Sequence, residues 1–278
     1  MSPVDQVGYW TELKLEIVRD YASAYSTIMS NQTDPALEHF YVDAFAGPGV
    51  NISKATGQLI PGSPTNALNV SPPFCEYHLI DADGDKLDML EDSLRGRTDR
   101  DVTTYSGDCN EILIEKVFPL VPYNRYRRAL CLLDPYNIDL DWQVMSAAGE
   151  MRSVEIFLNF MVMDINRGVL RRNPELIDPQ QAERLTRFWG DGSWRDAAYT
   201  TQGRLFDDMP GKTGNDALAD AFRKRLRDVA GFRYVPEPLP MRNSKNAVLY
   251  YLFFASPNAV GSKIVEQIFK KYRDRGAD

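Results

Sequence analysis

Glycines and polar residues gather at four points of this 278-residue chain, each at or directly after the end of a short apolar segment. In an open parallel sheet, ligands bind in the crevice beyond the carboxyl ends of the strands. If the apolar segments are neighbouring strands, the four groups therefore line one site. The groups are, in chain order, Asp43, Phe45, Ala46, Gly47 and Gly49; Asp81, Ala82 and Asp83; Gly107, Asp108 and Cys109; and Asp134, Pro135 and Tyr136.

The order of residue types across the first three groups predicts a ligand that contains adenosine. Glycines such as Gly47 and Gly49 let the backbone approach a ligand closely. A carboxylate after the second strand can accept both hydroxyls of a ribose, and one after the third can accept from an adenine amino group. The third glycine of the dinucleotide fingerprint is missing, and a polar loop over 51–61 replaces the helix that would hold a pyrophosphate. Both absences favour S-adenosylmethionine (SAM), which has no phosphate, over NAD.

Alternating strands and helices are expected to position these groups. Apolar residues at three- and four-residue steps predict a first helix over about 10–30. The repeated order of strand, turn and helix, with nearly continuous apolar strands, predicts an α/β fold with a parallel sheet covered on both faces. The predicted strands are 40–45, 74–80, 102–105, 129–133 and 154–160, with helices at 63–70, around 87–94, around 112–118 and at 142–151.

The region from about 162 to 230 departs from this alternation. It contains two predicted helices, 180–189 and 215–229, joined by connectors rich in glycine and aspartate, so we expect a helical insertion. Two later strands, 232–235 and 247–255, are expected to form an antiparallel pair at the sheet edge, before a last helix over 260–272. We therefore expect one domain over 1–278.

Charge and cysteine content argue against several classes of protein. The chain has 32 basic and 39 acidic residues and a formal net charge of −7, whereas proteins that hold a long duplex by charge alone carry a basic excess. The 3 cysteines show no CxxC spacing, so no disulfide framework is indicated and we expect no metal. The start lacks the pattern of a signal peptide, and no apolar run reaches the length of a membrane span. We expect a cytoplasmic protein with no membrane contact.

The strand-end motifs resemble those of class I SAM-dependent methyltransferases. More narrowly, the chain resembles the bacterial three-Cys-motif partner (TcmP) family. The resemblance implies a Rossmann-like class I methyltransferase fold, with a mostly parallel seven-stranded sheet, an antiparallel edge strand and a helical insertion. It implies SAM as methyl donor, with S-adenosylhomocysteine as product, and the family name implies a companion protein. The matching stretches are 41–49 (YVDAFAGPG), 62–64 (GSP), 132–136 (LLDPY), 157–160 (FLNF) and 249–256 (LYYLFFAS), with Trp10, Lys14, Leu15 and Tyr21.

The fourth group, Asp134-Pro135-Tyr136, resembles the Asp/Asn-Pro-Pro-Tyr tetrad of enzymes that methylate exocyclic amino groups of adenine or cytosine, but it lacks the second proline. We expect its three residues to be catalytic and Asp134 also to contact the cofactor, together with Asp43, Phe45, Ala46, Gly47, Gly49, Asp81, Ala82, Asp83, Asp108 and Cys109. A carboxylate and a backbone carbonyl can accept the two hydrogens of an amine, and an aromatic ring can stack on a base and attract a cationic donor. The predicted methyl acceptor is therefore an amino group of a nucleobase, nucleoside or nucleic acid.

Other interpretations of the fourth group remain open. The acceptor is alternatively a hydroxyl or amine of a small natural product, with Asp134 as general base. The chain is alternatively a partner protein that binds SAM without catalysis. An aspartate followed by proline is also a common start of a helix.

Tyr136 of the fourth group and four residues outside the groups are expected to contact the methyl acceptor. Trp10 and Lys14 lie in the first turns of the predicted helix 10–30. The others lie at or after the carboxyl ends of predicted strands, at the edge that carries the four groups. A further basic and aromatic segment, 123–128 (YNRYRR), has residue types that bind phosphates or stack on bases. It precedes the fourth strand, opposite the predicted site, so we interpret it as a solvated loop. The expected acceptor-binding residues are Trp10, Lys14, Tyr136, Asn159 and Arg167.

Overall fold

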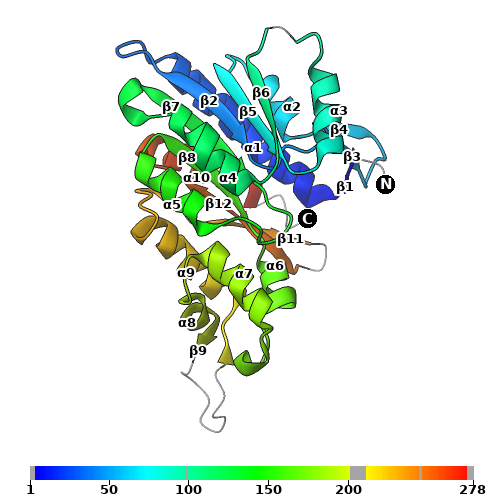
Figure 1. Cartoon of the computed structure of the whole chain (residues 1–278), viewed down its shortest axis with the longest axis vertical. Helices are drawn as coiled ribbons and strands as arrows, with labels where there is room; N and C mark the ends of the chain where they lie inside the picture. Colours follow the sequence, from blue (N-terminus) through cyan, green and yellow to red (C-terminus); the bar gives the residue numbers. More distant parts are fainter. Residues whose placement is uncertain (1–3, 98, 201–210, 244–245, 274–278) are drawn as a thin grey trace.

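A computed structural model describes residues 4–97, 99–200, 211–243 and 246–273. Within these residues, a seven-stranded sheet has the order β11-β12-β8-β7-β2-β5-β6 (Figure 1). The strands from β2 to β8 in this sheet run parallel, and β12 runs antiparallel to β8. The expected α/β fold, with a mostly parallel, Rossmann-like seven-stranded sheet, is confirmed. The strands are β2 (Glu38–Asp43), β5 (Glu76–Asp81), β6 (Val102–Ser106), β7 (Arg127–Leu133), β8 (Val154–Phe160), β11 (Leu239–Arg242) and β12 (Val248–Ala255).

The edge of the sheet differs from the prediction in its outermost strand. The segment 232–235 is not a strand, although Tyr234 forms an isolated bridge with Ser256. The edge strand is β11, which contains Pro240 and lies in the proline-rich stretch that follows. An edge strand tolerates proline because one side of its hydrogen-bond ladder has no partner strand. The antiparallel β12 therefore lies one position in from the edge.

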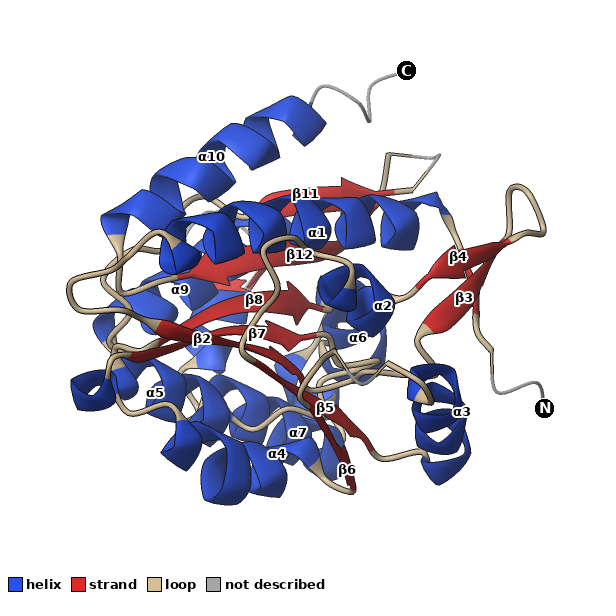
Figure 2. Ribbon diagram, turned by 90° about the horizontal axis from the view of Figure 1, so that it is seen from above, coloured by secondary structure: helices blue, strands red, loops and turns tan. Residues whose placement is uncertain are grey.

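Helices cover both faces of the sheet (Figure 2). Side chains alternate between the two faces of a strand. In β8, Ile156, Leu158 and Phe160 join the core beneath α5, whereas Phe157 joins the core beneath α1. One face carries α1 (Tyr9–Ser30), α2 (Ser63–Leu68), α3 (Gly84–Leu94) and α10 (Ala259–Arg273), and the other carries α4 (Cys109–Ile112), a π-helical turn (Leu113–Val117), a 3-10 turn (Phe118–Leu120) and α5 (Trp142–Met151).

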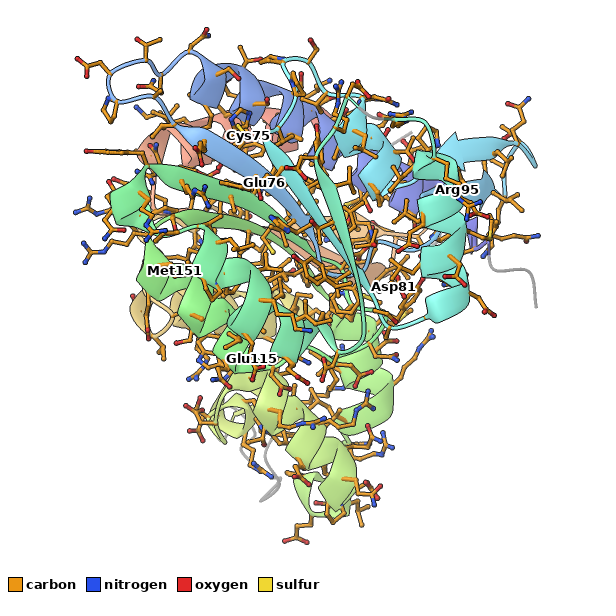
Figure 3. The ribbon with its side chains drawn as sticks, turned by 45° about the horizontal axis from the view of Figure 1, so that its top comes forward. Cys75, Glu76, Asp81, Arg95, Glu115 and Met151 are labelled. Carbon is orange, nitrogen blue, oxygen red and sulfur yellow. The ribbon has the colours of Figure 1, made fainter. Side chains whose placement is uncertain are left out.

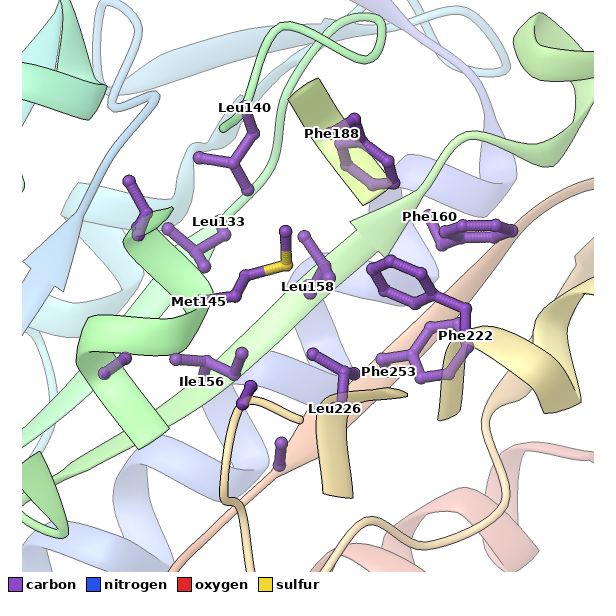
Figure 4. Close-up of a cluster of buried hydrophobic side chains, with 14 of the residues drawn as sticks. Leu133, Leu140, Met145, Ile156, Leu158, Phe160, Phe188, Phe222, Leu226 and Phe253 are labelled. Atoms are coloured by element: carbon purple, nitrogen blue, oxygen red, sulfur yellow. The ribbon is translucent and has the colours of Figure 1, made fainter. Parts of the chain in front are cut away.

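The region predicted as an insertion is helical in its described part, and residues 201–210 lie outside that part. Its aromatic side chains pack onto the sheet (Figure 4). The ring centroid of Phe222 lies 4.7 Å from that of Phe160 and 5.3 Å from that of Phe188. The insertion therefore completes the core on the α5 face. Its elements are α6 (Val162–Asp164), a π-helical turn (Ile165–Val169), a 3-10 turn (Pro174–Leu176), α7 (Pro179–Trp189), α8 (Trp194–Ala198), β9 (Tyr199–Thr200), β10 (Gly211–Lys212) and α9 (Asn215–Asp228).

A small second sheet replaces part of the loop predicted over 51–61. The strands β3 (Val50–Ser53) and β4 (Leu59–Pro61) form a hairpin, and β1 (Gln6–Val7) pairs in parallel with β3. These strands are too short and too polar for an alternating pattern to reveal them. Their pairing places the N-terminal segment beside the glycine turn. In the described parts of the chain, no helix is long and apolar enough to cross a membrane.

A carboxyl group is buried where β8 meets α1 and α10. Glu155 is 4% exposed and accepts hydrogen bonds from the Tyr21 hydroxyl at 2.5 Å and the Ser256 hydroxyl at 2.8 Å. Burial raises the pKa of Glu155 to about 7, against the lowering effect of these two hydrogen bonds. The fold therefore favours the neutral carboxyl.

We expect Glu155→Gln to stabilise the protein above neutral pH and to have little effect in acid. The pKa of Glu155 is higher in the folded than in the unfolded chain, so the wild type loses stability as pH rises from 4.5 to about 7. The variant lacks this loss, and its advantage in the free energy of unfolding grows to at most about 3 kcal/mol near pH 8. Urea unfolding at about pH 5 and about pH 8 measures the difference. An advantage that does not change with pH would contradict a neutral buried carboxyl.

Candidate functional site

Two adjoining cavities lie at the carboxyl ends of the parallel strands. The strand order reverses between β2 and β7, and such a reversal is the usual ligand site of an open α/β sheet. Phe45 and Tyr136 line both cavities. The acidic cavity, of about 570 Å³, is lined by residues that include Asp81, Ala82, Asp83, Lys86, Gly107, Asp108 and Cys109. The glycine-turn cavity, of about 420 Å³, is lined by residues that include Lys14, Ala46, Gly47, Gly49, Asp134, Pro135 and Asn159.

The turn after β2 needs its two glycines for different reasons. Both adopt left-handed backbone, with φ of +62° at Gly47 and +78° at Gly49. A Cβ at Gly47 would meet no atom within 4 Å, so a side chain there would extend into open space. A Cβ at Gly49 would lie 2.8 Å from Leu90 Cδ1. Gly47 thus keeps the cavity open, and Gly49 lets the turn pack against α3.

Two carboxylates hold this turn. Asp81 Oδ2 accepts from the Gly47 N–H at 2.7 Å, and its Oδ1 accepts from the Asp83 N–H at 2.8 Å. Asp43 is fully buried and accepts from the Phe45 N–H at 3.2 Å, and burial raises its pKa to about 7. Figure 3 shows Asp81 at one end of β5 and Glu76 at the other. Asp81 lines the acidic cavity, whereas Asp43 shapes the turn from inside the core.

The next two acidic residues begin helices and also line the acidic cavity. Asp83 Oδ1 accepts from two N–H groups at the start of α3, and Asp108 Oδ1 accepts from the Asn110 N–H at 2.9 Å. Each cap uses Oδ1, and no described residue donates to Oδ2 of either carboxylate, so these oxygens can accept from a ligand. Cys109 is buried, and burial and the neighbouring Asp108 raise the pKa of its thiol to about 12. A thiol with this pKa is unsuited to nucleophilic attack.

Asp134 lies where α1, β7 and β8 meet. Its Oδ2 forms a short ion pair with the Lys14 ammonium, and its Oδ1 accepts from the Asn159 side-chain amide at 2.8 Å. The Lys14 side chain is 5% exposed and that of Asp134 is 25% exposed. The other amide atom of Asn159, Oδ1, is buried and has no hydrogen-bond partner within the described chain. Three residues predicted separately thus form one cluster in the glycine-turn cavity.

A second polar cluster, of Asp5, Lys86 and Tyr136, contributes to the lining of both cavities. Asp5 Oδ2 accepts from the Tyr136 hydroxyl and from the Lys86 ammonium, each at 2.7 Å. The same ammonium donates to the Tyr136 hydroxyl at 2.9 Å. Burial, reinforced by Asp5, raises the pKa of Tyr136 to about 12. The sequence analysis did not identify Asp5 and Lys86, because nothing local distinguishes them from other surface charges.

Tyr136→Phe should loosen the N-terminal segment and leave the ring in place. The backbone carbonyls of Asp5 and Val7 accept from the N–H groups of Ile52 at 2.9 Å and Lys54 at 2.8 Å. Loss of a charge-assisted hydrogen bond is expected to speed hydrogen exchange at these two amides by about tenfold. Tyr126→Phe, on an exposed tyrosine far from the cluster, is the control. Equal exchange rates in both variants would show that Tyr136 does not hold the segment.

Two of the expected acceptor-binding residues lie away from both cavities. Trp10 packs against the core around α1, and its backbone carbonyl accepts from the Tyr250 hydroxyl at 3.0 Å. Arg167 lines a separate cavity of about 280 Å³ with Asn137 and Arg184, next to the Asp134-Pro135-Tyr136 turn. Among the described residues, no group of three or more His, Cys, Asp or Glu side chains could hold a metal ion.

The fold, but not the sequence, matches known proteins. No family model matches the chain, and no curated protein matches it significantly. Protein LPL1258 of Legionella pneumophila, described as a DUF519 family member, superposes with a TM-score of 0.56 at 11% identity, over 93% of this chain and 91% of that one. Trm1 of Pyrococcus horikoshii, in complex with S-adenosyl-L-methionine, superposes with a TM-score of 0.43 at 12% identity, over 91% of this chain and 58% of that one.

A SAM-dependent methyltransferase of Leishmania major superposes with a TM-score of 0.39 at 11% identity, over 88% of this chain and 82% of that one. The likeness to the Legionella protein shows a shared fold. At such identities and scores, activity must be argued from the site itself.

Proposed function

We propose that this chain is a SAM-dependent methyltransferase that modifies an amino group of a nucleobase, nucleoside or nucleic acid. One observation carries the proposal: the acidic cavity and the glycine-turn cavity share Phe45 and Tyr136, and the second also contains Asp134 and Pro135. A ligand whose adenosine lies in the acidic cavity can therefore extend to the Asp134-Pro135-Tyr136 turn.

The residues around the two cavities fit SAM. Asp81 would hold the ribose hydroxyls, Asp108 the adenine amino group, and the backbone at Gly47 the amino-acid end of the molecule. The open space above Gly47 and the available Oδ2 of Asp108 support these assignments. When bound, SAM supplies a methyl group carried on a cationic sulfur.

The surroundings of Asp134 favour an amine over a hydroxyl acceptor. Lys14 and Asn159 hold the carboxylate in place, and each of its oxygens keeps a second lone pair that can accept from an amine. The Pro135 carbonyl supplies another acceptor. A general base must instead take up a proton, which would break the buried ion pair with Lys14 at a cost of several kcal/mol. Asp134 is therefore better suited to orient an amine than to deprotonate a hydroxyl.

The TcmP resemblance supports SAM-dependent methyl transfer, and it names no methyl acceptor. Its motifs 41–49, 132–136 and 157–160 contribute Gly47, Asp134 and Asn159, which all line the glycine-turn cavity. We infer membership of this family from that convergence. The companion protein that the family name implies would be an added requirement for activity.

Incubation with radiolabelled SAM tests the proposal. The purified protein is offered oligonucleotides, nucleosides and cell extract in separate reactions. Label in oligonucleotides or nucleosides supports the proposal, and label that requires the extract indicates a companion protein. Label confined to other small molecules supports the natural-product alternative. Absence of transfer by a protein that binds S-adenosylhomocysteine supports the non-catalytic alternative.

Arg167→Glu distinguishes a polyanionic acceptor from a nucleoside. Arg167 lies beside the Asp134-Pro135-Tyr136 turn. Reversing the charge of this side chain should therefore remove a phosphate contact and raise the KM for an oligonucleotide by about tenfold at low salt. The KM for a nucleoside should not change. Arg95→Glu, at the far end of α3, is the matched control because its side chain is 81% exposed. An unchanged oligonucleotide KM would remove Arg167 from the acceptor site.

A further inference from the structure

A third cavity, of about 450 Å³, lies at the opposite edge of the sheet, and we call it the amino-edge cavity. It is bounded by the starts of β7 and β8, the C-terminal half of α1 and the first residues of α10. The two cavities of the proposed active site lie beyond the other ends of the same strands. Any ligand of the amino-edge cavity is therefore separate from the methyl donor and acceptor.

Arginines dominate the charge of this cavity. Arg128, Arg152 and Arg233 line it, and Glu155 is the acidic residue in its wall. None of the three arginines forms an ion pair with a carboxylate in the described part of the chain, whereas Arg127 pairs with Glu38. Glu155 is hydrogen-bonded to two hydroxyls, and its neutral form is favoured by burial. The cavity thus carries concentrated positive charge in a chain of net charge −7.

The position of Arg152 is itself unusual. It follows the last residue of α5 with φ of +56°, a conformation that favours glycine or asparagine. An arginine in this conformation is strained relative to glycine. Strained backbone of this kind is typical of residues whose side chain has a functional role. The side chain of Arg152 lines the amino-edge cavity, where no described carboxylate pairs with it.

Two buried hydroxyl groups in the cavity wall lack partners. Tyr25 is 3% exposed and Ser153 is 1% exposed, and neither hydroxyl has a hydrogen-bond partner among the residues described. Buried hydroxyls nearly always have a partner, so two orphans in one wall indicate a missing polar ligand. The N-terminus of α10, a 15-residue helix, also borders the cavity at Asn258 and Ala259. A helix N-terminus adds positive potential, and here Asn258 Oδ1 accepts from the Val260 N–H at 2.9 Å.

An aromatic ring at the rim suggests what accompanies the anionic group. Tyr123 is 54% exposed, and the Arg128 guanidinium carbon lies 3.9 Å from the centroid of its ring. A ring and a guanidinium in this arrangement form a surface on which a base can stack. The segment 123–128, interpreted from sequence as a solvated loop, thus contributes to a cavity.

We propose that the amino-edge cavity binds a phosphate-bearing small molecule of mononucleotide size. The arginines and the α10 N-terminus would bind a phosphate group. The hydroxyls of Tyr25 and Ser153 would form hydrogen bonds with its remaining oxygens or with a ribose, and the Tyr123 ring would stack on a base. The volume lies in the range of small-molecule sites, about 300–1,000 Å³. The partnerless hydroxyls are buried in the wall, which favours a small ligand over a polynucleotide lying across the surface.

Calorimetry with uridine monophosphate tests the proposal. The protein is first saturated with S-adenosylhomocysteine, so that the proposed cofactor site is occupied; if that compound does not bind, the titration is run without it. Uridine monophosphate should bind once per chain, inorganic phosphate more weakly, and uridine not measurably. The proposal is overturned if neither uridine monophosphate nor inorganic phosphate binds. It is also overturned if an oligonucleotide, titrated in the same way, binds and uridine monophosphate does not. This result is independent of whether the chain transfers methyl groups.

Four variants make the test specific. Arg152→Glu and Arg233→Glu should each weaken uridine monophosphate binding by about tenfold or more, as expected for a lost charge-assisted contact. Arg125→Glu, in the same loop as Tyr123 but outside the cavity wall, should leave it unchanged. Tyr25→Phe should weaken binding by about threefold without lowering the melting temperature, because no described residue forms a hydrogen bond with the hydroxyl. Equal effects of all three arginine reversals would overturn a defined site.

Discussion

Asp81→Asn is expected to weaken binding of S-adenosylhomocysteine by about ten- to a hundredfold. Asp81 lines the acidic cavity and accepts from the Gly47 N–H at 2.7 Å. Asparagine keeps the size of the side chain and one acceptor oxygen, so it can retain the bond from the Gly47 N–H but loses the one from the Asp83 N–H. A ribose would then lose a charged acceptor, which is typically worth about 1.5–3 kcal/mol.

Calorimetry measures this affinity, and the matched control is Asp85→Asn. Asp85 is an exposed carboxylate in the first turn of α3, and it does not line the acidic cavity. Circular dichroism and thermal unfolding establish that both variants fold. An affinity for S-adenosylhomocysteine that is the same in Asp81→Asn and wild type would refute the assignment of Asp81 to the ribose.

Asp134→Asn is expected to lower kcat by about a hundred- to a thousandfold and to change the affinity for S-adenosylhomocysteine far less. The substitution removes the charge that would orient the acceptor amine. It also leaves the Lys14 ammonium, whose side chain is 5% exposed, without its carboxylate. Such an unpaired buried charge typically costs about 3–5 kcal/mol of stability.

A double variant separates catalysis from stability in this prediction. Lys14→Met in the Asp134→Asn background removes the unpaired ammonium, so we expect thermal stability to recover and kcat to stay low. Asp88→Asn, an exposed carboxylate of α3, is the control for a neutral amide substitution. Recovery of kcat together with stability in the double variant would mean that the Lys14–Asp134 pair is only structural.

The positions of the strand-end residues follow from the local sequence. Short apolar runs such as 154–160 mark strands, and the glycines and acids after them mark strand ends. Parallel strands place their carboxyl ends at one edge, so Asp81, Asp108 and Asp134 were expected to share one region. Pattern and turn chemistry act over a few residues, and a single sequence therefore reports them well.

The partners of these residues depend on contacts between distant segments. Lys14 was expected to contact the acceptor, but it pairs with Asp134, which lies 120 positions away. Asp5 and Lys86 meet at Tyr136 because β1 pairs with β3, a pairing that no local pattern reveals. The edge strand β11 was likewise hidden by its prolines.

The amino-edge cavity likewise depends on contacts between segments that are distant in sequence. Arg128, Arg152 and Arg233 are separated in sequence by 24 and 81 positions, and Tyr25 comes from a helix that precedes them all. Arg128 and Arg152 converge because β7 and β8 are adjacent and parallel. Tyr25 and the start of α10 join them because α1 and α10 pack on one face of the sheet, which the chain reaches after β12. Chemical type is a property of each residue, but proximity is a property of the packed sheet. The local sequence is therefore sufficient for the residue types and for most of the elements, but not for the short strands β1, β3 and β4 or the edge strand β11, and only packing brings the residues together into sites.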